Sequence, residues 1–210
     1  MDKPLISIVI TTHGSGYDVP VILGSIKNQR EYEPGKDSNT GREYLWASKD
    51  SCTLEYETIV VWDGERIVGA DEYHAHQIIL CPKEGGVGHH TREPGIKAAN
   101  GEWIVLTNSD NYFCSGWLHR ISGFFAEDVG MVTYDCLNNL WRWSNYGGTK
   151  LLRGHIDLSA AVVRADVAKK VGFPWRNYDG DWDYIKACLR ECQARNLKVA
   201  YVDETLCVHN

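Results

Sequence analysis

Several acidic or imidazole side chains come soon after short apolar segments in this sequence. His13, Asp63 and Asp110 are three such residues, and a further carboxylate, Asp181, stands at the start of an amphipathic segment. A carboxylate accepts hydrogen bonds from N–H groups and binds hard divalent cations through its oxygen atoms. It can also take a proton from a hydroxyl group as that group reacts. These residue types could therefore bind a polar ligand, hold a cation and move a proton, provided that the fold brings them together.

The apolar segments that precede these residues predict buried strands. They are short, rich in β-branched residues and bounded by turn-forming residues. We expect strands at 6–12, 58–62, 77–81 and 103–107 in the first half of the chain, and at 130–134, 157–164 and 198–203 in the second.

Segments with apolar residues at helical spacing separate these strands. Asp18 can cap a helix whose apolar face includes Val19, Ile22 and Ile26. Further helices are expected at 94–100, 117–125 and 181–195. Two other segments, which are polar or contain glycine, predict an inserted surface loop at 30–56 and an aromatic loop at 135–154.

This alternation predicts an α/β fold with an open, mostly parallel central sheet and flanking helices. In such sheets the ligand lies beyond the carboxyl ends of the strands. We therefore expect Thr11, His13, Asp63, Arg92 and Asp110 to converge on one edge of the sheet.

Composition excludes some classes of protein. The chain has 210 residues, of which 43% are hydrophobic and 24% charged, as in a single soluble domain. No apolar run approaches the roughly 20 residues of a spanning helix, which excludes an integral membrane protein but leaves room for peripheral association. The 22 Lys and Arg against 28 Asp and Glu give a net charge of −6, which disfavours nucleic-acid binding. Seven scattered cysteines and the absence of a signal-like N-terminus indicate a reduced, cytoplasmic protein.

Five short motifs occur in order along the chain, and together they resemble the nucleotide-sugar glycosyltransferases of family 2. They are ISIVITTHGSG, VVWDGE, GGVGHHTREPGI, GEWIVLTNSDN and YDGDWDY. The resemblance extends from Pro4 to His209 and implies a single GT-A domain over 1–210, with a Rossmann-like nucleotide-binding half at about 1–111 and an acceptor-binding, catalytic half at about 112–210. It implies inverting transfer of a sugar from a nucleotide-diphosphate sugar, with UDP favoured, to a saccharide or other hydroxyl acceptor in glycan or polysaccharide synthesis.

The resemblance also assigns donor-binding residues. Thr11 and His13 correspond to nucleotide contacts, and Asp63 to the acceptor of a hydrogen bond from the base. Arg92 ends a G-x-x-x-R stretch that the family places near the diphosphate. Simpler interpretations are a turn at Asp63-Gly64 and a solvated surface arginine at 92.

The metal motif of the family, Asp-x-Asp, is incomplete in this chain. The matching segment contains Asn108, Ser109 and Asp110, so only the last carboxylate remains. The family often supplies a His soon after the final strand, and His209 matches that position. A divalent cation, Mn²⁺ or Mg²⁺, is therefore expected on Asp110 and His209, with phosphate oxygens and water as its other ligands. Ser109 is expected beside the donor.

Asp181 matches the second member of the Glu-Asp pair that the family places near the acceptor. Gly180 replaces the Glu. We assign Asp181 as the base that deprotonates the acceptor hydroxyl, with Asp179 and Asp183 as neighbours of similar chemistry. A carboxylate at this place is also typical of a helix N-terminus.

Other functions fit the sequence less well. Asn108 and Gly180, which replace two carboxylates of the family, would suit a sugar- or nucleotide-binding module without catalysis. A nucleotidyltransferase would use a similar nucleotide site, but it needs a basic loop after the first strand, and no Lys or Arg follows that strand until Lys27. The glycine cluster at 85–88 lacks the ending of a phosphate-binding P-loop. Cys188 and Cys192 share one helical face and predict packing. A zinc site could draw on His74, His76, Cys81, His89 and His90, but their spacing matches no tetrahedral pattern. An acceptor-binding loop is suggested by Trp141, Trp143, Tyr146, His155 and Asp157, and filling of the core explains these aromatic residues equally well.

Overall fold

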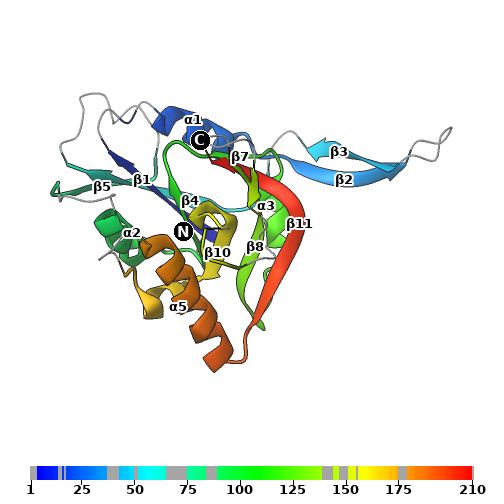
Figure 1. Ribbon diagram of the computed structural model, residues 1–210. Helices are drawn as coiled ribbons and strands as arrows, with labels where there is room; N and C mark the ends of the chain where they lie inside the picture. Colours follow the sequence, from blue (N-terminus) through cyan, green and yellow to red (C-terminus); the bar gives the residue numbers. More distant parts are fainter. Residues whose placement is uncertain are drawn as a thin grey trace.

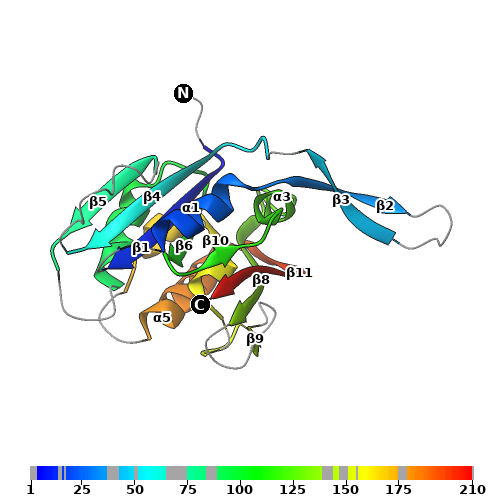
Figure 2. The same ribbon diagram turned by 90° about the horizontal axis from the view of Figure 1, so that it is seen from above.

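A single mixed β-sheet with helices on both faces organises the computed structural model (Figures 1 and 2). The structure describes residues 4–13, 16, 18–36, 43–49, 52–64, 75–83, 89–138, 144–146, 151–154, 156–174 and 179–209. Its strands are β1 (Ile6–His13), β2 (Glu31–Lys36), β3 (Glu43–Lys49), β4 (Tyr56–Asp63), β5 (Gln77–Cys81), β6 (Trp103–Asn108), β7 (Tyr112–Phe113), β8 (Val129–Asn138), β9 (Ser144–Tyr146), β10 (Ala161–Arg164) and β11 (Lys198–His209). Its α-helices are α1 (Val19–Lys27), α2 (Arg92–Ala98), α3 (Trp117–Ser122), α4 (Ala165–Val171) and α5 (Gly180–Ala194), and short 3₁₀ helices lie at His89–Thr91 and Leu158–Ala160.

The first half of the sheet is parallel. Strands β5, β4, β1 and β6 lie side by side in that order, and each neighbouring pair runs parallel. Residues of β1 alternate between the two faces and are buried on both, which is why its sequence is a nearly continuous apolar run. The expected strands of this half are present, and their carboxyl ends share one edge.

The second half of the sheet is mixed, which corrects the expectation of a mostly parallel sheet. The order continues with β10, β8, β11 and β7, and β9 pairs with β8. β10 is antiparallel to both β6 and β8, whereas β11 is parallel to β8. Only four residues form β10, so the segment 157–164 contributes a short strand after a 3₁₀ turn rather than one long strand.

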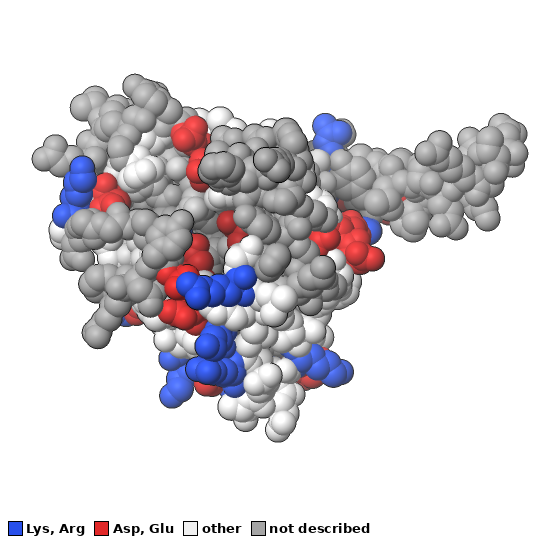
Figure 3. Space-filling model, in the orientation of Figure 1, with Lys and Arg blue, Asp and Glu red and all other residues white. Residues whose placement is uncertain are grey.

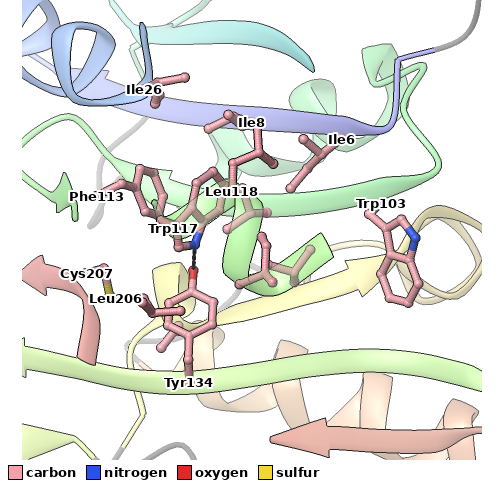
Figure 4. Close-up of a cluster of buried hydrophobic side chains, with 14 of the residues drawn as sticks. Ile6, Ile8, Ile26, Trp103, Phe113, Trp117, Leu118, Tyr134, Leu206 and Cys207 are labelled. Atoms are coloured by element: carbon pink, nitrogen blue, oxygen red, sulfur yellow. Dashed lines mark hydrogen bonds between the residues drawn. The ribbon is translucent and has the colours of Figure 1, made fainter. Parts of the chain in front are cut away.

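Two apolar clusters fill the space between the sheet and its helices. One cluster combines Ile8 of β1 with Ile26 of α1 and Trp117 of α3 (Figure 4). The other lies on the opposite face and combines Val9 with Ile96 of α2 and Ile185 of α5. Alternate residues of β1 thus enter different clusters, as the pleat of a strand requires.

Helices begin close to the expected positions, with one omission. α2 starts at Arg92, two residues before the expected start, and α5 spans Gly180–Ala194. Asp18 occupies the N-cap position of α1, but its side chain makes no capping hydrogen bond. α4 was not expected, because Ala165 follows β10 directly and no N-cap residue separates them.

The two expected loops contain strands. Within 30–56, β2 and β3 form an antiparallel hairpin that extends away from the main sheet (Figures 1 and 2). Within 135–154, β8 continues to Asn138 and pairs with β9. Polar residues and glycine in both segments, and Pro34 in the first, obscured these strands, because neither segment has the apolar alternation of a core strand.

None of the seven cysteines, all of which the structure describes, forms a disulfide bond. Cys188 and Cys192 are buried in the apolar cluster that includes Val9, which confirms that they pack. No helix in the described part of the chain is long and apolar enough to cross a membrane.

Candidate active site

A cleft of about 580 Å³ lies at the carboxyl ends of β1, β4 and β6. All eight site residues expected from the sequence line this one cleft. They are Thr11, His13, Asp63, Arg92, Ser109, Asp110, Asp181 and His209. The lining also includes Thr12, His89, Thr91, Asn108 and Asp157, which come from the same strand ends and from the segments that precede α2 and β10.

Arg92 is held at the floor of the cleft by the packing of α2. Gly95, one turn further on, allows the helix to lie against β1, because a Cβ atom there would overlap the side chain of Val9. Only 3% of Arg92 is exposed, and its guanidinium lies 5.2 Å from the ring centroid of Phe173, a cation–π contact. Arg92 is therefore a buried, oriented cation rather than a solvated surface residue.

Asn108 accepts the hydrogen bonds that organise this floor. Its Oδ1 atom accepts from Arg92 Nη2 at 3.0 Å and from Thr11 Oγ1 at 3.1 Å. A neutral amide in this position bridges β1, β6 and α2 without neutralising the charge of Arg92. The residue that departs from the family motif is thus fully used as a hydrogen-bond acceptor.

Asp181 faces Arg92 from the first turn of α5. Its Oδ1 atom lies 3.5 Å from Arg92 Nη2 and 3.7 Å from His89 Nε2, and makes no hydrogen bond within the described residues. Burial raises the pKa of Asp181, and the charge of Arg92 partly offsets this shift. A carboxylate with a raised pKa and an unused oxygen atom is suited to accept a proton.

Gly180 permits this arrangement. A Cβ atom at position 180 would overlap the ring of His89, so the start of α5 can approach His89 only because the residue is glycine. Burial, together with the nearby charge of Arg92, lowers the pKa of His89 to about 4. His89 is therefore neutral at physiological pH and does not compensate the charge of the nearby Asp181 carboxylate.

Asp63 lines the cleft at the end of β4. Its Oδ1 atom is 3.2 Å from Nε2 of His90, and both side chains are about nine-tenths buried. Next to it, Gly64 has a φ of 96°, so the turn that follows β4 is present as well. The turn and a cleft-lining carboxylate coexist here.

Asp110 occupies the loop after β6. Burial raises the pKa of its carboxyl group, and the charge of His209 lowers it in part. Its buried Oδ1 atom makes no hydrogen bond within the described residues. The free oxygen is the kind of donor atom that a hard cation takes.

His209 lies at the end of β11, where β11 pairs with β7. Its Nδ1 atom is 2.9 Å from Asn111 Oδ1 and 3.2 Å from Asp157 Oδ2. Asp157 also accepts hydrogen bonds from the backbone N–H and the hydroxyl group of Ser159. These contacts fix the ring of His209 on the wall of the cleft.

Buried polar atoms without hydrogen bonds are concentrated in this cleft. Within the described residues, six such atoms belong to its lining: Thr12 Oγ1, Asp63 Oδ1, His89 Nδ1, Arg92 Nε, Asp110 Oδ1 and Asp181 Oδ1. Native proteins leave few buried polar atoms unpaired, because each costs about 1–3 kcal/mol. Their concentration at one place marks a site prepared for a polar ligand.

The charge of the cleft is unbalanced toward acid. Asp63, Asp110, Asp157 and Asp181 line it, whereas Arg92 is the one Lys or Arg among its described lining residues. Figure 3 shows Asp and Glu side chains in the middle of the face that it draws, above a group of Lys and Arg side chains over α5. Within the described residues, no group of three or more His, Cys, Asp or Glu could hold a metal ion by itself.

Three neighbours of the assigned residues were not given roles by sequence reasoning. His89 and His90 were considered only as zinc ligands, but they contact Asp181 and Asp63 instead. Asn111 was not singled out, although its amide lies at the centre of a hydrogen-bond network. Its place directly after Asp110, in a motif of site residues, is the signal that could have indicated it.

Several residues that were considered from the sequence do not line the cleft. His76 pairs with Thr58 on β4, away from the cleft, and Asp179 forms an ion pair with Arg153. Asp183 does not line the cleft. Other residues considered in the sequence analysis lie outside the described residues or have side chains that are not described. They are His74, Gly85, Gly86, Gly88, Trp141, Trp143, Tyr146 and His155.

Comparison with solved structures identifies the fold. S. aureus TarS 1–349 in complex with UDP-GlcNAc matches with a TM-score of 0.67 at 16% identity, over 97% of this chain and 57% of that one. The mannosyltransferase PcManGT from Pyrobaculum calidifontis, in complex with GDP-Man and Mn²⁺, matches with a TM-score of 0.63 at 15% identity, over 100% and 57%. Glucosyl-3-phosphoglycerate synthase from Mycobacterium tuberculosis, in complex with Mn²⁺, UDP and phosphoglyceric acid, matches with a TM-score of 0.61 at 14% identity, over 99% and 71%.

The chain therefore has the GT-A fold that these proteins share. It spans 36% of the S. aureus TarS chain and 57% to 60% of the other TarS structures. The sequence matches no protein-family model and no curated protein sequence.

Proposed function

We propose that this protein is an inverting glycosyltransferase that moves a sugar from a nucleotide-diphosphate sugar, with UDP as the nucleotide, to a hydroxyl group of a saccharide or similar acceptor in glycan synthesis. The observation that carries the proposal is the convergence of Asp63, Arg92, Asp110 and Asp181 on one cleft in a GT-A fold. The similar structures that contain UDP-GlcNAc, GDP-Man or UDP support it as a reaction class.

The nucleotide is proposed to lie over the ends of β1 and β4. Asp63 would accept a hydrogen bond from an N–H group of uracil, since a carboxylate can only accept. Thr11 and His13, at the end of β1, would contact the rest of the nucleoside. Arg92 would face the diphosphate, where its buried charge is least screened by water.

A divalent cation fits the chemistry of Asp110 and His209. Asp110 offers a buried oxygen atom that makes no hydrogen bond within the described residues, and the charge of His209 acts on the same carboxyl group. Two protein ligands suffice when phosphate oxygens and water complete the coordination. A cation would also offset the repulsion between a diphosphate and four carboxylates, which Arg92 alone cannot balance.

Among the carboxylates near the cleft that are not assigned to the nucleotide or the cation, Asp181 is the one proposed as the base. Asp157 already accepts from Ser159 and from Asn111, and Asp179 is held by a bidentate contact with Arg153. Asp181 Oδ1 makes no hydrogen bond within the described residues, and burial raises its pKa. The acceptor hydroxyl would therefore lose its proton to Asp181.

The reaction then follows as a single displacement. The acceptor oxygen forms a bond to the anomeric carbon while the bond from that carbon to the diphosphate oxygen breaks. The hydroxyl proton goes to Asp181, and the bonding electrons leave with the nucleoside diphosphate. Arg92 stabilises the charge that develops on the leaving group, and a bound cation would add Lewis-acid stabilisation there.

The proposal is tested by incubating the protein with UDP-, GDP-, dTDP- and CDP-sugars, each with Mn²⁺ or EDTA, and measuring release of the nucleoside diphosphate. We expect release from a UDP-sugar, by slow hydrolysis when no acceptor is added. Tight UDP binding without any release, even with a panel of saccharide acceptors, would favour a nucleotide-sugar-binding module instead.

Calorimetry of UDP binding tests the cation separately. We expect tighter binding with Mn²⁺ than with EDTA, and Asp110→Ala should abolish that difference. Asp203→Ala removes an exposed carboxylate on β11 and serves as the matched control. Equal affinity of the parent protein with and without Mn²⁺ would leave Arg92 as the sole partner of the diphosphate.

A further inference from the structure

A hydrogen-bond network behind the cleft joins β6, β11 and the 3₁₀ turn before β10. It centres on Asn111, of which only 2% is exposed. The amide nitrogen of Asn111 donates to Thr107 Oγ1 at 3.2 Å, to Ser159 Oγ at 3.2 Å and to Asp157 Oδ1 at 3.4 Å. The amide oxygen faces Nδ1 of His209 at 2.9 Å.

The orientation of the Asn111 amide is set by its neighbours. The hydroxyl of Ser159 donates its proton to Asp157, so its oxygen is an acceptor toward Asn111. The hydroxyl of Thr107 likewise donates to the carbonyl oxygen of Asn108. The side of Asn111 that faces these hydroxyl groups must therefore be the NH₂ group, and the side that faces His209 must be the oxygen.

Two acceptors consequently face Nδ1 of His209. One is Asn111 Oδ1 and the other is Asp157 Oδ2, at 3.2 Å, and neither can donate a proton to the ring. Nδ1 must carry the hydrogen. In the neutral imidazole the lone pair then belongs to Nε2. The side chain of His209 is 20% exposed and lines the cleft, so this lone pair is available there.

We propose that Asn111 and Asp157 are positioning residues that hold His209 in the tautomer with the proton on Nδ1, so that Nε2 is presented as a ligand for a divalent cation in the cleft. The inference rests on the cation of the proposed function. Carboxylate or carbonyl oxygens behind a ligating imidazole fix its tautomer and orientation and raise its basicity. Asp157 thus serves the cation rather than the acceptor hydroxyl.

The tautomer is tested in the metal-free protein by two-dimensional ¹H–¹⁵N NMR of the histidine rings at pH 8, with His209→Gln to assign the signals. We expect His209 to show its hydrogen on Nδ1. In Asp157→Asn, the new NH₂ group can take the place of Oδ2 beside Nδ1 of His209, while the remaining Oδ1 atom still accepts from the N–H of Ser159. The form of His209 that carries its proton on Nε2 should then become populated. A wild-type ring protonated on Nε2 would overturn the inference.

Cation affinity gives the second measurement, by electron paramagnetic resonance of free Mn²⁺ in the presence of UDP. Removing such outer partners typically weakens metal binding by about 10- to 100-fold. We expect a loss of that size in Asp157→Asn and no change in Asp203→Asn, the same exchange on an exposed part of β11. Melting temperatures in EDTA check that both variants fold.

The two parts can fail separately. If His209→Ala weakens Mn²⁺ binding but Asp157→Asn and Asn111→Ala do not, the positioning role is wrong. If the ring is protonated on Nδ1 but the parent protein binds no Mn²⁺ with UDP, the cation of the proposed function is wrong.

Discussion

Two buried polar regions of this molecule are built in opposite ways. Between α3 and β8, the indole N–H of Trp117 donates to the hydroxyl of Tyr134 at 2.7 Å (Figure 4). That hydroxyl donates in turn to the carbonyl of Ser159. In the cleft, by contrast, Asp110 and Asp181 each keep an oxygen atom without a hydrogen bond in the described part of the chain. The core uses its polar groups to join elements, whereas the cleft keeps them for a ligand.

Gln29 extends the same contrast. Its amide nitrogen donates to the carbonyls of Ser25 and Cys114, and its amide oxygen accepts from the N–H of Leu118. One buried side chain thereby links α1 to α3. Substitutions in the two regions should therefore change different quantities: folding stability in the core, and binding or turnover in the cleft.

The largest effect is expected from Asp181→Asn. The amide keeps the shape of the side chain but cannot take a proton, so turnover should fall by about 10²- to 10⁴-fold. Nucleotide affinity and melting temperature should stay near those of the parent. Asp183→Asn, in the same helical turn but outside the cleft lining, is the matched control. Product NMR with the true acceptor should show inverted anomeric configuration, and a retained configuration would contradict the single displacement.

Gln29→Leu should have the next largest effect, on folding stability. It removes the side-chain partner of the Leu118 N–H and of the Ser25 carbonyl, whereas the Cys114 carbonyl keeps the backbone N–H of Trp117. Each unpaired buried group costs about 1–3 kcal/mol. We expect a loss of about 2–4 kcal/mol in urea denaturation, with unchanged UDP affinity for the folded protein. Gln193→Leu, at an exposed position on α5, should change neither quantity. A stable Gln29→Leu protein would mean that water or a backbone shift replaces the amide.

Asp63→Ala should weaken UDP binding by about 1.5–3 kcal/mol, the value of a hydrogen bond to a charged group. Calorimetry at one fixed salt and Mn²⁺ concentration measures this difference. The loss should be smaller for CDP, because cytosine has an unprotonated N3 where uracil has its ring N–H group. Equal losses for UDP and CDP would show that Asp63 acts only through its turn and its contact with His90.

The smallest effect concerns pH and His89. Because burial and Arg92 lower its pKa in the folded protein to about 4, against an ordinary value of 6.5, the unfolded chain binds a proton more readily between these two pH values. Stability should therefore fall as the pH drops from 6.5 toward 4. His89 should account for about 1 kcal/mol between pH 7.5 and 5.5.

Urea denaturation of the parent and of His89→Gln across this range checks the sign. The variant should lose less stability on acidification, whereas His119→Gln on α3 should behave like the parent. An equal loss of stability in the parent and in His89→Gln between pH 7.5 and 5.5 would show that His89 gains its proton without difficulty in the folded state.

Several of the residues that line the cleft could be predicted from the sequence because they come soon after the predicted strands. Asp63 and Asp110 come at the ends of apolar runs whose length and composition predict parallel strands, so their meeting at one edge could be expected. The hairpin of β2 and β3 could not be, because polar residues, proline and glycine conceal its strand pattern. The contact between Asp157 and His209 depends on β11 extending to residue 209 and pairing with β7. Periodicity along the chain carries no information on such a distant pairing.

Gly180 and His89 carry a consequence for how this site can change by mutation. The ring of His89 fills the space that a side chain at 180 would need. An acidic residue at 180 and an imidazole at 89 are therefore mutually exclusive. Replacing Gly180 alone creates a clash with His89, and replacing His89 alone with a small residue leaves a void. Gly180→Glu should be far better tolerated together with His89→Ala than alone, a case of epistasis between positions that are 91 residues apart in the chain. Sequences related to this one should vary at the two positions together.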